Sequence, residues 1–169
     1  MSLEEKANSQ PLLRQATEED ALFIAHRLRE ADVAEIYAAS RASPLEALLR
    51  GINTSVPHAW VLDSPTTGKP FVIGGITPLG GQAGLVWLLA TPEIEQHALT
   101  FQREAWRHLQ AVWKSGEFTA IGNIIHTKND KAITWLQRLG FTIVYRDQPV
   151  GVSGELFHVF TMTRPVEAN

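Results

Sequence analysis

The sequence predicts a single α+β domain built on a mixed β-sheet. The chain has 169 residues, of which 44% are hydrophobic and 20% are charged, as is ordinary for one globular domain. Apolar residues alternate or run continuously in some short segments, as in strands, and recur every three to four residues in others, as in helices. The predicted order is strand, helices, three strands, helix, strand, helix and two strands, which favours an α+β arrangement.

The first half of the chain is predicted to hold a strand, three helices and three further strands. Residues 1–10 are polar and charged, so we expect a disordered lead-in before a domain that spans residues 11–164. Thr17 and Asp20 have the spacing of a helix N-cap, and Pro44 suits the first position of a helix. The expected elements are a strand at 12–16, helices over about 17–28, 32–39 and 44–52, and strands at 59–62, 71–77 and 85–90.

The second half is predicted to alternate between helices and strands. Thr91 and Pro92 start a long helix that runs through Trp113. Gly140 ends a shorter helix, because glycine readily takes the left-handed conformation found at helix ends. The expected elements are helices at 91–113 and 129–139, strands at 120–125, 141–145 and 155–163, and a tail at 165–169.

Composition and charge exclude several classes of protein. The net charge is −3 and the Lys and Arg residues are scattered, so we expect no nucleic-acid partner. No apolar run approaches the roughly 20 residues that cross a bilayer, and the N-terminus has no signal-peptide pattern, so we expect neither membrane insertion nor secretion. The chain has no cysteine, and its six histidines include no close pair with metal-ligand spacing, so no metal site is predicted.

The segment Asn129–Phe141 carries the most specific motif. It reads Asn-Asp-Lys-Ala-Ile-Thr-Trp-Leu-Gln-Arg-Leu-Gly-Phe and lies between two predicted strands. In that setting it resembles the acetyl-CoA-binding half of the GNAT N-acetyltransferases, and the order of elements is similar over about residues 12–163. The resemblance implies a single-domain GNAT-like fold with a mixed, mostly antiparallel central sheet of about six to seven strands and helices on both faces. It also implies acetyl transfer from acetyl-CoA to an amine.

A narrower resemblance involves three segments. Residues 87–89, 129–141 and 151–160 are similar to the GNAT-like internal virion or core proteins of short-tailed bacteriophages. This resemblance implies a phage- or prophage-encoded protein, located in the cytoplasm of the bacterial host or in the virion. Its partners would be other virion proteins or a second copy of itself.

The resemblance also implies where a cofactor would bind. GNAT enzymes pair a strand with the pantetheine arm and wrap the pyrophosphate in a glycine-rich loop that opens a helix. Here the loop at 91–98 has no Gly, Arg or Lys, and Glu93 and Glu95 repel phosphate, so we expect acetyl-CoA to bind weakly or not at all. The implied cofactor-binding residues are Leu88, Leu89, Ala90, Thr91 and Asn129.

Three residues are candidate catalytic groups. Many GNAT enzymes carry a tyrosine acid where this chain has Leu136. His126, at the end of a strand, can act as a base, and Asn123 is a polar amide in an apolar strand. Tyr37 lies on a helix that borders the acceptor site in GNAT folds.

Each candidate also has a structural interpretation. Asn129 can cap the helix that follows it, and His126 can be a surface residue. Asn123 can be an interior amide satisfied by its neighbours. Glu35 and Glu46 lie on the acceptor-side helices and are interpreted as solvated charges.

Two functional hypotheses follow. The first is an acyl-CoA-dependent transferase, and the second is a non-catalytic GNAT-fold protein of virion assembly or a binding module. An open cleft between strands 85–90 and 120–125 favours the transferase. A cleft plugged by Trp87, Trp106 or other side chains favours the non-catalytic protein.

Overall fold

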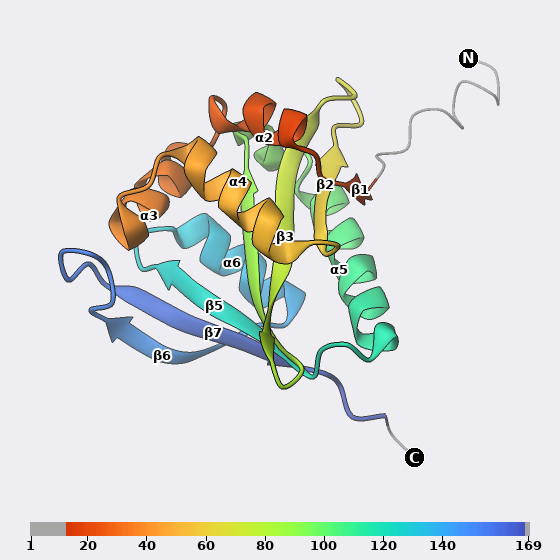
Figure 1. Ribbon diagram of the computed structural model, residues 1–169, viewed down its shortest axis with the longest axis vertical. Coiled ribbons are helices and arrows are strands. Elements are labelled where there is room, and N and C mark those ends of the chain that lie inside the picture. The colour runs from red at the N-terminus through yellow and green to blue at the C-terminus, as the bar shows by residue number, and fades with distance from the viewer. Residues whose placement is uncertain (1–12, 168–169) are drawn as a thin grey trace.

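The computed structural model describes residues 13–167 (Figure 1). The predicted lead-in at 1–10 and the last two residues of the predicted tail lie outside this range. A seven-stranded sheet has the order β1-β2-β3-β4-β5-β7-β6, and only the β4–β5 pair is parallel. The strands are β1 (Leu13–Gln15), β2 (Ala59–Asp63), β3 (Pro70–Gly80), β4 (Ala83–Ala90), β5 (Ala120–His126), β6 (Thr142–Gln148) and β7 (Phe157–Thr163).

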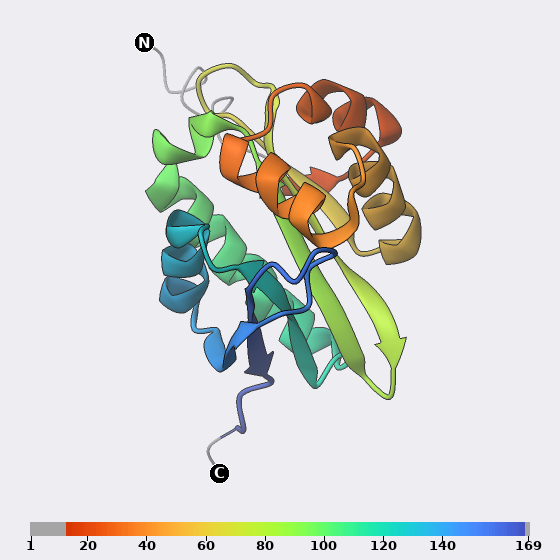
Figure 2. The same ribbon diagram turned by 90° about the vertical axis from the view of Figure 1, so that its left-hand side faces the viewer.

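Helices cover both faces of the sheet (Figures 1 and 2). On one face lie α2 (Glu18–Ala25), α3 (Glu30–Ser40) and α4 (Pro44–Ser55). The other face carries α5 (Ala98–Ser115) and α6 (Asp130–Leu139). The predicted fold class, a mixed and mostly antiparallel sheet between two layers of helices, is therefore confirmed.

Local signals set the ends of several helices. Thr17 and Asp20 form a capping box at the start of α2, and Ser43 and Glu46 form another at the start of α4. Gly140 ends α6 at φ 103°, a left-handed conformation that glycine adopts without steric cost.

The predicted continuous helix from Thr91 to Trp113 is wrong at its beginning. A 3₁₀ turn, η1 (Pro92–Glu95), comes first, and α5 begins only at Ala98. Two interactions fix the position of this turn. The side chain of Ile94 is fully buried, and the carboxylate of Glu93 accepts hydrogen bonds from Ser64 and Thr66 in the β2–β3 turn.

The two faces of the central strands pack against different helices, because side chains alternate along each strand. Val61, Ile73 and Leu89 pack beneath α2, α3 and α4. Their neighbours Trp60, Val72 and Ala90 belong to the opposite core, which α5 and α6 cover. Because both faces are apolar, the sheet needs helices on both sides.

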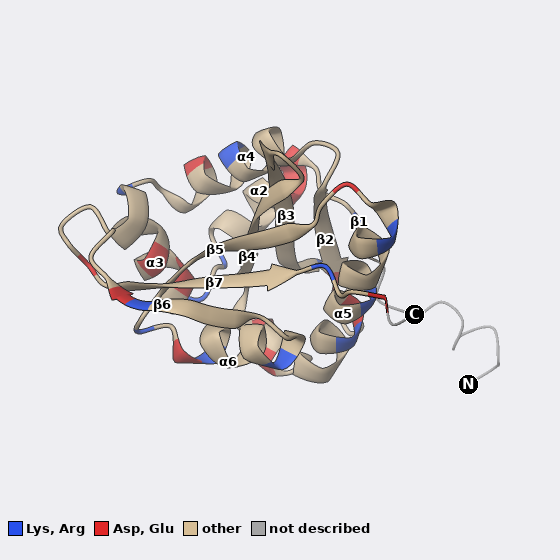
Figure 3. Ribbon diagram, turned by 90° about the horizontal axis from the view of Figure 1, so that it is seen from below, with Lys and Arg blue, Asp and Glu red and all other residues tan. Residues whose placement is uncertain are grey.

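Acidic and basic residues are interspersed along the ribbon of the domain (Figure 3). None of the helices within residues 13–167 combines the length and apolar content that a bilayer span requires. The same residues contain no cluster of three His, Cys, Asp or Glu side chains that could hold a metal ion.

Candidate active site

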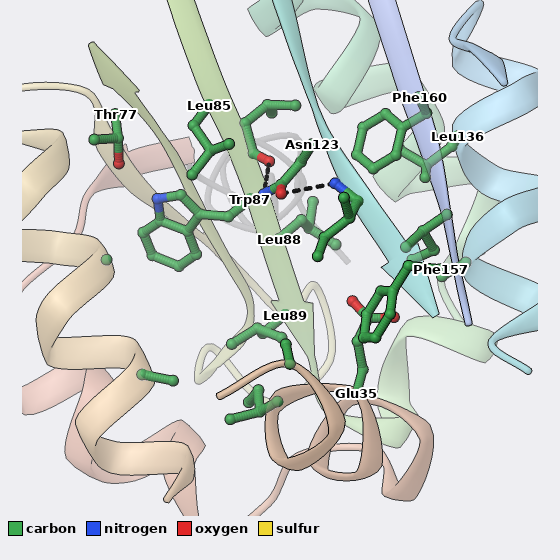
Figure 4. Close-up of a pocket in the computed structure, with 18 of the residues that line it drawn as sticks. Glu35, Thr77, Leu85, Trp87, Leu88, Leu89, Asn123, Leu136, Phe157 and Phe160 are labelled. Carbon is green, nitrogen blue, oxygen red and sulfur yellow. Dashed lines mark hydrogen bonds between the residues drawn. The ribbon is translucent and has the colours of Figure 1, made fainter. Parts of the chain in front are cut away.

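The candidate site is the opening where β4 and β5 separate. The two strands pair in parallel only at their beginnings, from Ala83↔Ala120 to Leu85↔Gly122. Beyond Leu85 they diverge, and a cavity of about 330 Å³ lies between them (Figure 4). Its walls come from β3, β4, β5 and β7 and from helices on both faces of the sheet, namely α3 and α4 on one side and α5 and α6 on the other.

Asn123 holds the narrow end of this opening. Its side-chain amide donates a hydrogen bond to the Val86 carbonyl at 2.9 Å, across the gap from β5 to β4. Its carbonyl oxygen accepts the N–H of Ile124 at 2.7 Å, and both bonds are drawn in Figure 4. The polar amide in an apolar strand is therefore satisfied, and it lines the cavity while it joins the two strands.

The free edge of β4 offers one residue to a ligand. The Ala90 N–H donates to Asp32 at 3.0 Å, and the Ala90 carbonyl accepts the N–H of Arg29 at 2.9 Å. The Val86 carbonyl is taken by Asn123. Alternate residues of a strand direct their backbone groups to the same edge, so Leu88 faces the opening between these two points. The hydrogen bonds of the described residues leave the Leu88 N–H and C=O without a partner on that edge.

Glu35 supplies the only carboxylate among the described residues that line the cavity. It rises from α3 toward Phe157 (Figure 4) and accepts hydrogen bonds from the His126 backbone N–H at 3.0 Å and the Asn129 amide at 3.1 Å. Burial raises the pKa of Glu35 to about 7, and the nearby Asp32 charge adds to this, while the two donors oppose it.

The interpretation of Glu35 as a solvated charge is therefore wrong. Asp32 and Ile36 are both buried, so this side of α3 is turned toward the sheet. That spacing was the one signal in the sequence that could have identified Glu35. Glu46, by contrast, is exposed and caps α4, where its carboxylate accepts the Ser43 N–H at 2.8 Å.

A buried polar network fixes the position of Glu35. The amide of Asn129, which is only 2% exposed, donates to both Glu35 and Asp32. Asp32 in turn pairs with the Arg29 guanidinium at 3.0 Å, and that guanidinium lies over the ring of Trp135. Asn129 occupies the N-cap position of α6, as expected, but its side chain makes no hydrogen bond to the first turn of the helix, so the predicted capping bond is absent.

The other predicted catalytic side chains lie outside the cavity lining. The His126 ring packs against Phe157, with 5.2 Å between ring centroids, and burial followed by the Lys128 charge lowers its pKa. Tyr37 is 58% exposed beneath the Arg41 guanidinium. His126 contacts Glu35 through its backbone N–H, which donates to the Glu35 carboxylate, and its imidazole ring makes no hydrogen bond to that carboxylate. The catalytic roles of His126 and Tyr37 remain predictions.

The five residues implied for cofactor binding differ in whether they line the cavity or are buried away from it. Leu88 and Leu89 line the cavity, whereas Ala90 is fully buried at the end of β4. The Thr91 hydroxyl is buried and has no hydrogen-bond partner among the described residues. Of the five residues, only Leu88 and Leu89 are among those that line the cavity.

The charged side chains of the turn at 91–98 already interact with neighbouring residues. Glu93 is bonded to the β2–β3 turn, and His97 lies 3.4 Å from the same carboxylate. Glu95 forms an ion pair with Lys131 of α6 at 2.6 Å. The cavity wall is mostly apolar, and the turn contains no Gly, Lys or Arg.

Neither tryptophan named in the plugging hypothesis fills the opening. The Trp87 indole N–H donates to the Ser55 hydroxyl at 2.8 Å, and the ring packs so closely on α4 that a Cβ at Gly51 would lie 2.7 Å from it. Trp106 is 55% exposed and is not part of the cavity wall. The open cavity is the arrangement expected of the transferase hypothesis.

Solved structures share the whole fold. Ard1 from Thermoplasma volcanium superposes with a TM-score of 0.72 at 11% identity, over 93% of this chain and 99% of that one. A GNAT-family acetyltransferase from Bacillus anthracis gives 0.69 at 10% identity, over 92% and 95%. Spermidine N-acetyltransferase from Vibrio cholerae, in complex with CoA and spermine, gives 0.68 at 15% identity, over 93% and 97%. No protein-family model and no curated protein sequence matches the chain. The chain thus has the fold of the GNAT acetyltransferases.

Proposed function

We propose that this protein is an N-acyltransferase that moves an acyl group, nominally acetyl, from a pantetheine thioester such as acetyl-CoA to an amine. One observation carries the proposal. The β4–β5 opening forms a cavity of about 330 Å³ in which an unpaired strand edge at Leu88 and the carboxylate of Glu35 are both available.

Leu88 is the residue that would hold the donor. A pantetheine arm carries amide groups, and the free N–H and C=O of Leu88 can bind them as one strand binds another. Asn123 and Asp32 close the edge on either side, so the arm has a single register. The thioester, when bound, supplies the electrophilic carbonyl. The apolar side chains around it exclude water that would hydrolyse it.

Glu35 would act as the general base. An amine at neutral pH is protonated, and its nitrogen attacks only after it gives up that proton. A carboxyl group with a pKa of about 7 is partly ionised at that pH and can accept the proton. After attack, the nitrogen loses its remaining excess proton to solvent, and protonated Glu35 returns its proton to the sulfur as the carbon–sulfur bond breaks. No tyrosine among the described residues lines the cavity for that role, and Leu136 stands where many GNAT enzymes have one.

Acyl transfer from acetyl-CoA and from the short thioester S-acetyl-pantetheine to a panel of primary amines tests this proposal. We expect Glu35→Gln to lower kcat/KM by at least about 100-fold, as loss of a general base does. Glu46→Gln, on the neighbouring helix and outside the cavity, serves as the matched control and should leave the rate unchanged. A Glu35→Gln variant as fast as the parent would contradict the assignment.

The turn at 91–98 supports a second candidate function. Because it has no glycine and its charges are engaged, the fold is also compatible with a non-catalytic binding or assembly protein. Such a protein would be phage-encoded, would reside in the host cytoplasm or the virion, and would bind virion proteins or itself. A stable homo-oligomer or virion-protein complex, together with no turnover of either thioester, would favour this candidate.

A further inference from the structure

Asn129 links Glu35 to a buried ion pair. Its side-chain nitrogen donates to Glu35 Oε2 at 3.1 Å and to Asp32 Oδ1 at 3.3 Å. Its side-chain oxygen accepts from the Arg29 guanidinium at 3.4 Å, and that guanidinium also donates to Asp32 at 3.0 Å. These partners fix the orientation of the amide, because a reversed amide would set its oxygen against both carboxylates. Asn129 therefore presents its N–H groups to the two carboxylates.

The hydrogen bonds of Glu35 leave one of its oxygens free. Oε2 accepts the Asn129 amide and the His126 backbone N–H, whereas Oε1 accepts no hydrogen bond from residues 13–167. Arg50, the only other charged side chain of the described cavity wall, forms no ion pair with this carboxylate. Since Glu35 lines the cavity, Oε1 is the atom that can take a proton from an amine bound there.

The same network fixes the end of the strand that would hold the donor. Asp32 accepts the Ala90 N–H through Oδ2, and the Arg29 N–H donates to the Ala90 carbonyl. A continuous series of hydrogen bonds thus runs from the end of β4 through Asp32 and Asn129 to Glu35. It joins the strand that would bind the thioester to the group that would accept the proton.

The network is closed to solvent and electrically coupled. Arg29, Asp32 and Asn129 are 7%, 4% and 2% exposed, so a partner lost from this network is not easily replaced by bulk water. Burial raises the pKa of Glu35, and the bonds from Asn129 and His126 lower it. The Asp32 charge raises the same pKa and the Arg29 charge lowers it.

We propose that Asn129 is a positioning residue for the acyl transfer, which holds Glu35 by Oε2 so that Oε1 is presented to the amine. This inference rests on the proposed function. It assigns Asn129 to the base, whereas the family resemblance implied contact with the cofactor. Asn129 is not among the residues that line the cavity, so it acts through Glu35.

The link can be measured in the parent protein without any substrate. An NMR titration follows the Glu35 carboxyl carbon and the Asn129 side-chain amide as the pH is varied. We expect the amide signals to shift with the same midpoint as the carboxyl carbon, near pH 7, because the amide donates to the group that ionises. An Asn129 amide that does not respond to this ionisation would overturn the inference.

Asn129→Leu removes the donor with little change in the size of the side chain. The pKa of Glu35 should then rise by about one pH unit, as expected for the loss of one hydrogen bond to a charged group. Leu109→Ala is the control, because Leu109 is buried in the core of α5 and lies outside the cavity wall, so its loss should lower stability without moving this pKa. An equal Glu35 pKa in the parent and in Asn129→Leu would contradict the inference.

Kinetics distinguish a positioning residue from one that contacts the donor. The substrates are S-acetyl-pantetheine and the primary amine that the parent acylates fastest. Asn129→Leu should lower kcat by about tenfold and leave the KM for the thioester within about twofold of the parent value. The loss should persist at a pH where Glu35 is ionised in both proteins, because a misplaced base remains slow when charged. A raised KM with an unchanged kcat would instead assign Asn129 to donor binding and overturn the inference.

Failure of the acyl transfer would give a different set of results. If the parent turns over neither thioester with any amine, the proposed function is wrong. The NMR titrations then decide whether Asn129 holds Glu35: linked midpoints support this, and an unresponsive amide overturns it. The titration of the parent also decides the question if Asn129→Leu does not fold.

Discussion

Replacing Glu35 with glutamine should change how the stability of the protein depends on pH. Burial raises the pKa of Glu35 from its ordinary value of 4.5 to about 7. The folded state therefore keeps this proton to a higher pH than the unfolded chain does. The free energy of unfolding is highest below the unfolded pKa and falls as pH rises toward 7, because ionisation of the buried group opposes the fold.

The size of this change in stability follows from the unfolded and folded pKa values of Glu35. Each pH unit between the folded and unfolded pKa is equivalent to about 1.4 kcal/mol, so ionisation of Glu35 costs about 3 kcal/mol once the pH exceeds 7. Glutamine has nearly the same shape and cannot ionise. Its carbonyl oxygen can still accept from His126 or Asn129. The stability of the parent relative to Glu35→Gln should therefore fall by about 3 kcal/mol between about pH 4 and about pH 8.

Urea denaturation of both proteins at several pH values measures this difference. Glu46→Gln is a control of opposite sign. The Ser43 N–H lowers the pKa of Glu46, so its contribution is present above the unfolded pKa and is lost as pH falls. A difference between the parent and Glu35→Gln that stays constant across the pH range would refute the burial argument and remove the basis for Glu35 as a neutral-pH base.

Three further substitutions test other parts of the structure by denaturation. Trp135→Ala should destabilise by about 3–5 kcal/mol, because the indole is buried between Phe101 and Arg29, and near-unchanged stability would place the side chain elsewhere. Asn123→Ala should cost about 1–3 kcal/mol, since it deprives the Val86 carbonyl of its donor; no cost would show that the two strands are joined by other means. Thr91→Val should be neutral or stabilising because the hydroxyl is buried without a partner, and a loss above about 2 kcal/mol would reveal an unseen one.

Much of the fold was predictable because its signals are local. The Thr17 and Asp20 capping box and the glycine at 140 fix helix ends through bonds within a few residues. The continuous apolar runs of β2 and β3 mark strands that are buried on both faces. The break between η1 and α5 was missed, since it depends on the contact of Glu93 with a turn almost 30 residues earlier in the chain.

The site was harder to predict because it is assembled from distant segments. The sequence placed Leu88 and Leu89 at the cofactor strand and Asn123 at the cleft through a family resemblance, and the structure puts all three in the cavity wall. Glu35 became visible only when α3 was placed over the end of β5, where burial changes its chemistry. The bonds of Asn129 to Asp32 and Glu35 join residues nearly 100 positions apart, so no local pattern could reveal them.

The central claim is that the β4–β5 opening accepts a pantetheine arm while the turn at 91–98 adds little for the nucleotide end. Calorimetric titration of pantetheine and of coenzyme A into the same protein tests it most directly. We predict that both bind weakly and with affinities within about tenfold of each other, a difference of about 1.4 kcal/mol. Micromolar binding of coenzyme A, far tighter than that of pantetheine, would contradict the claim.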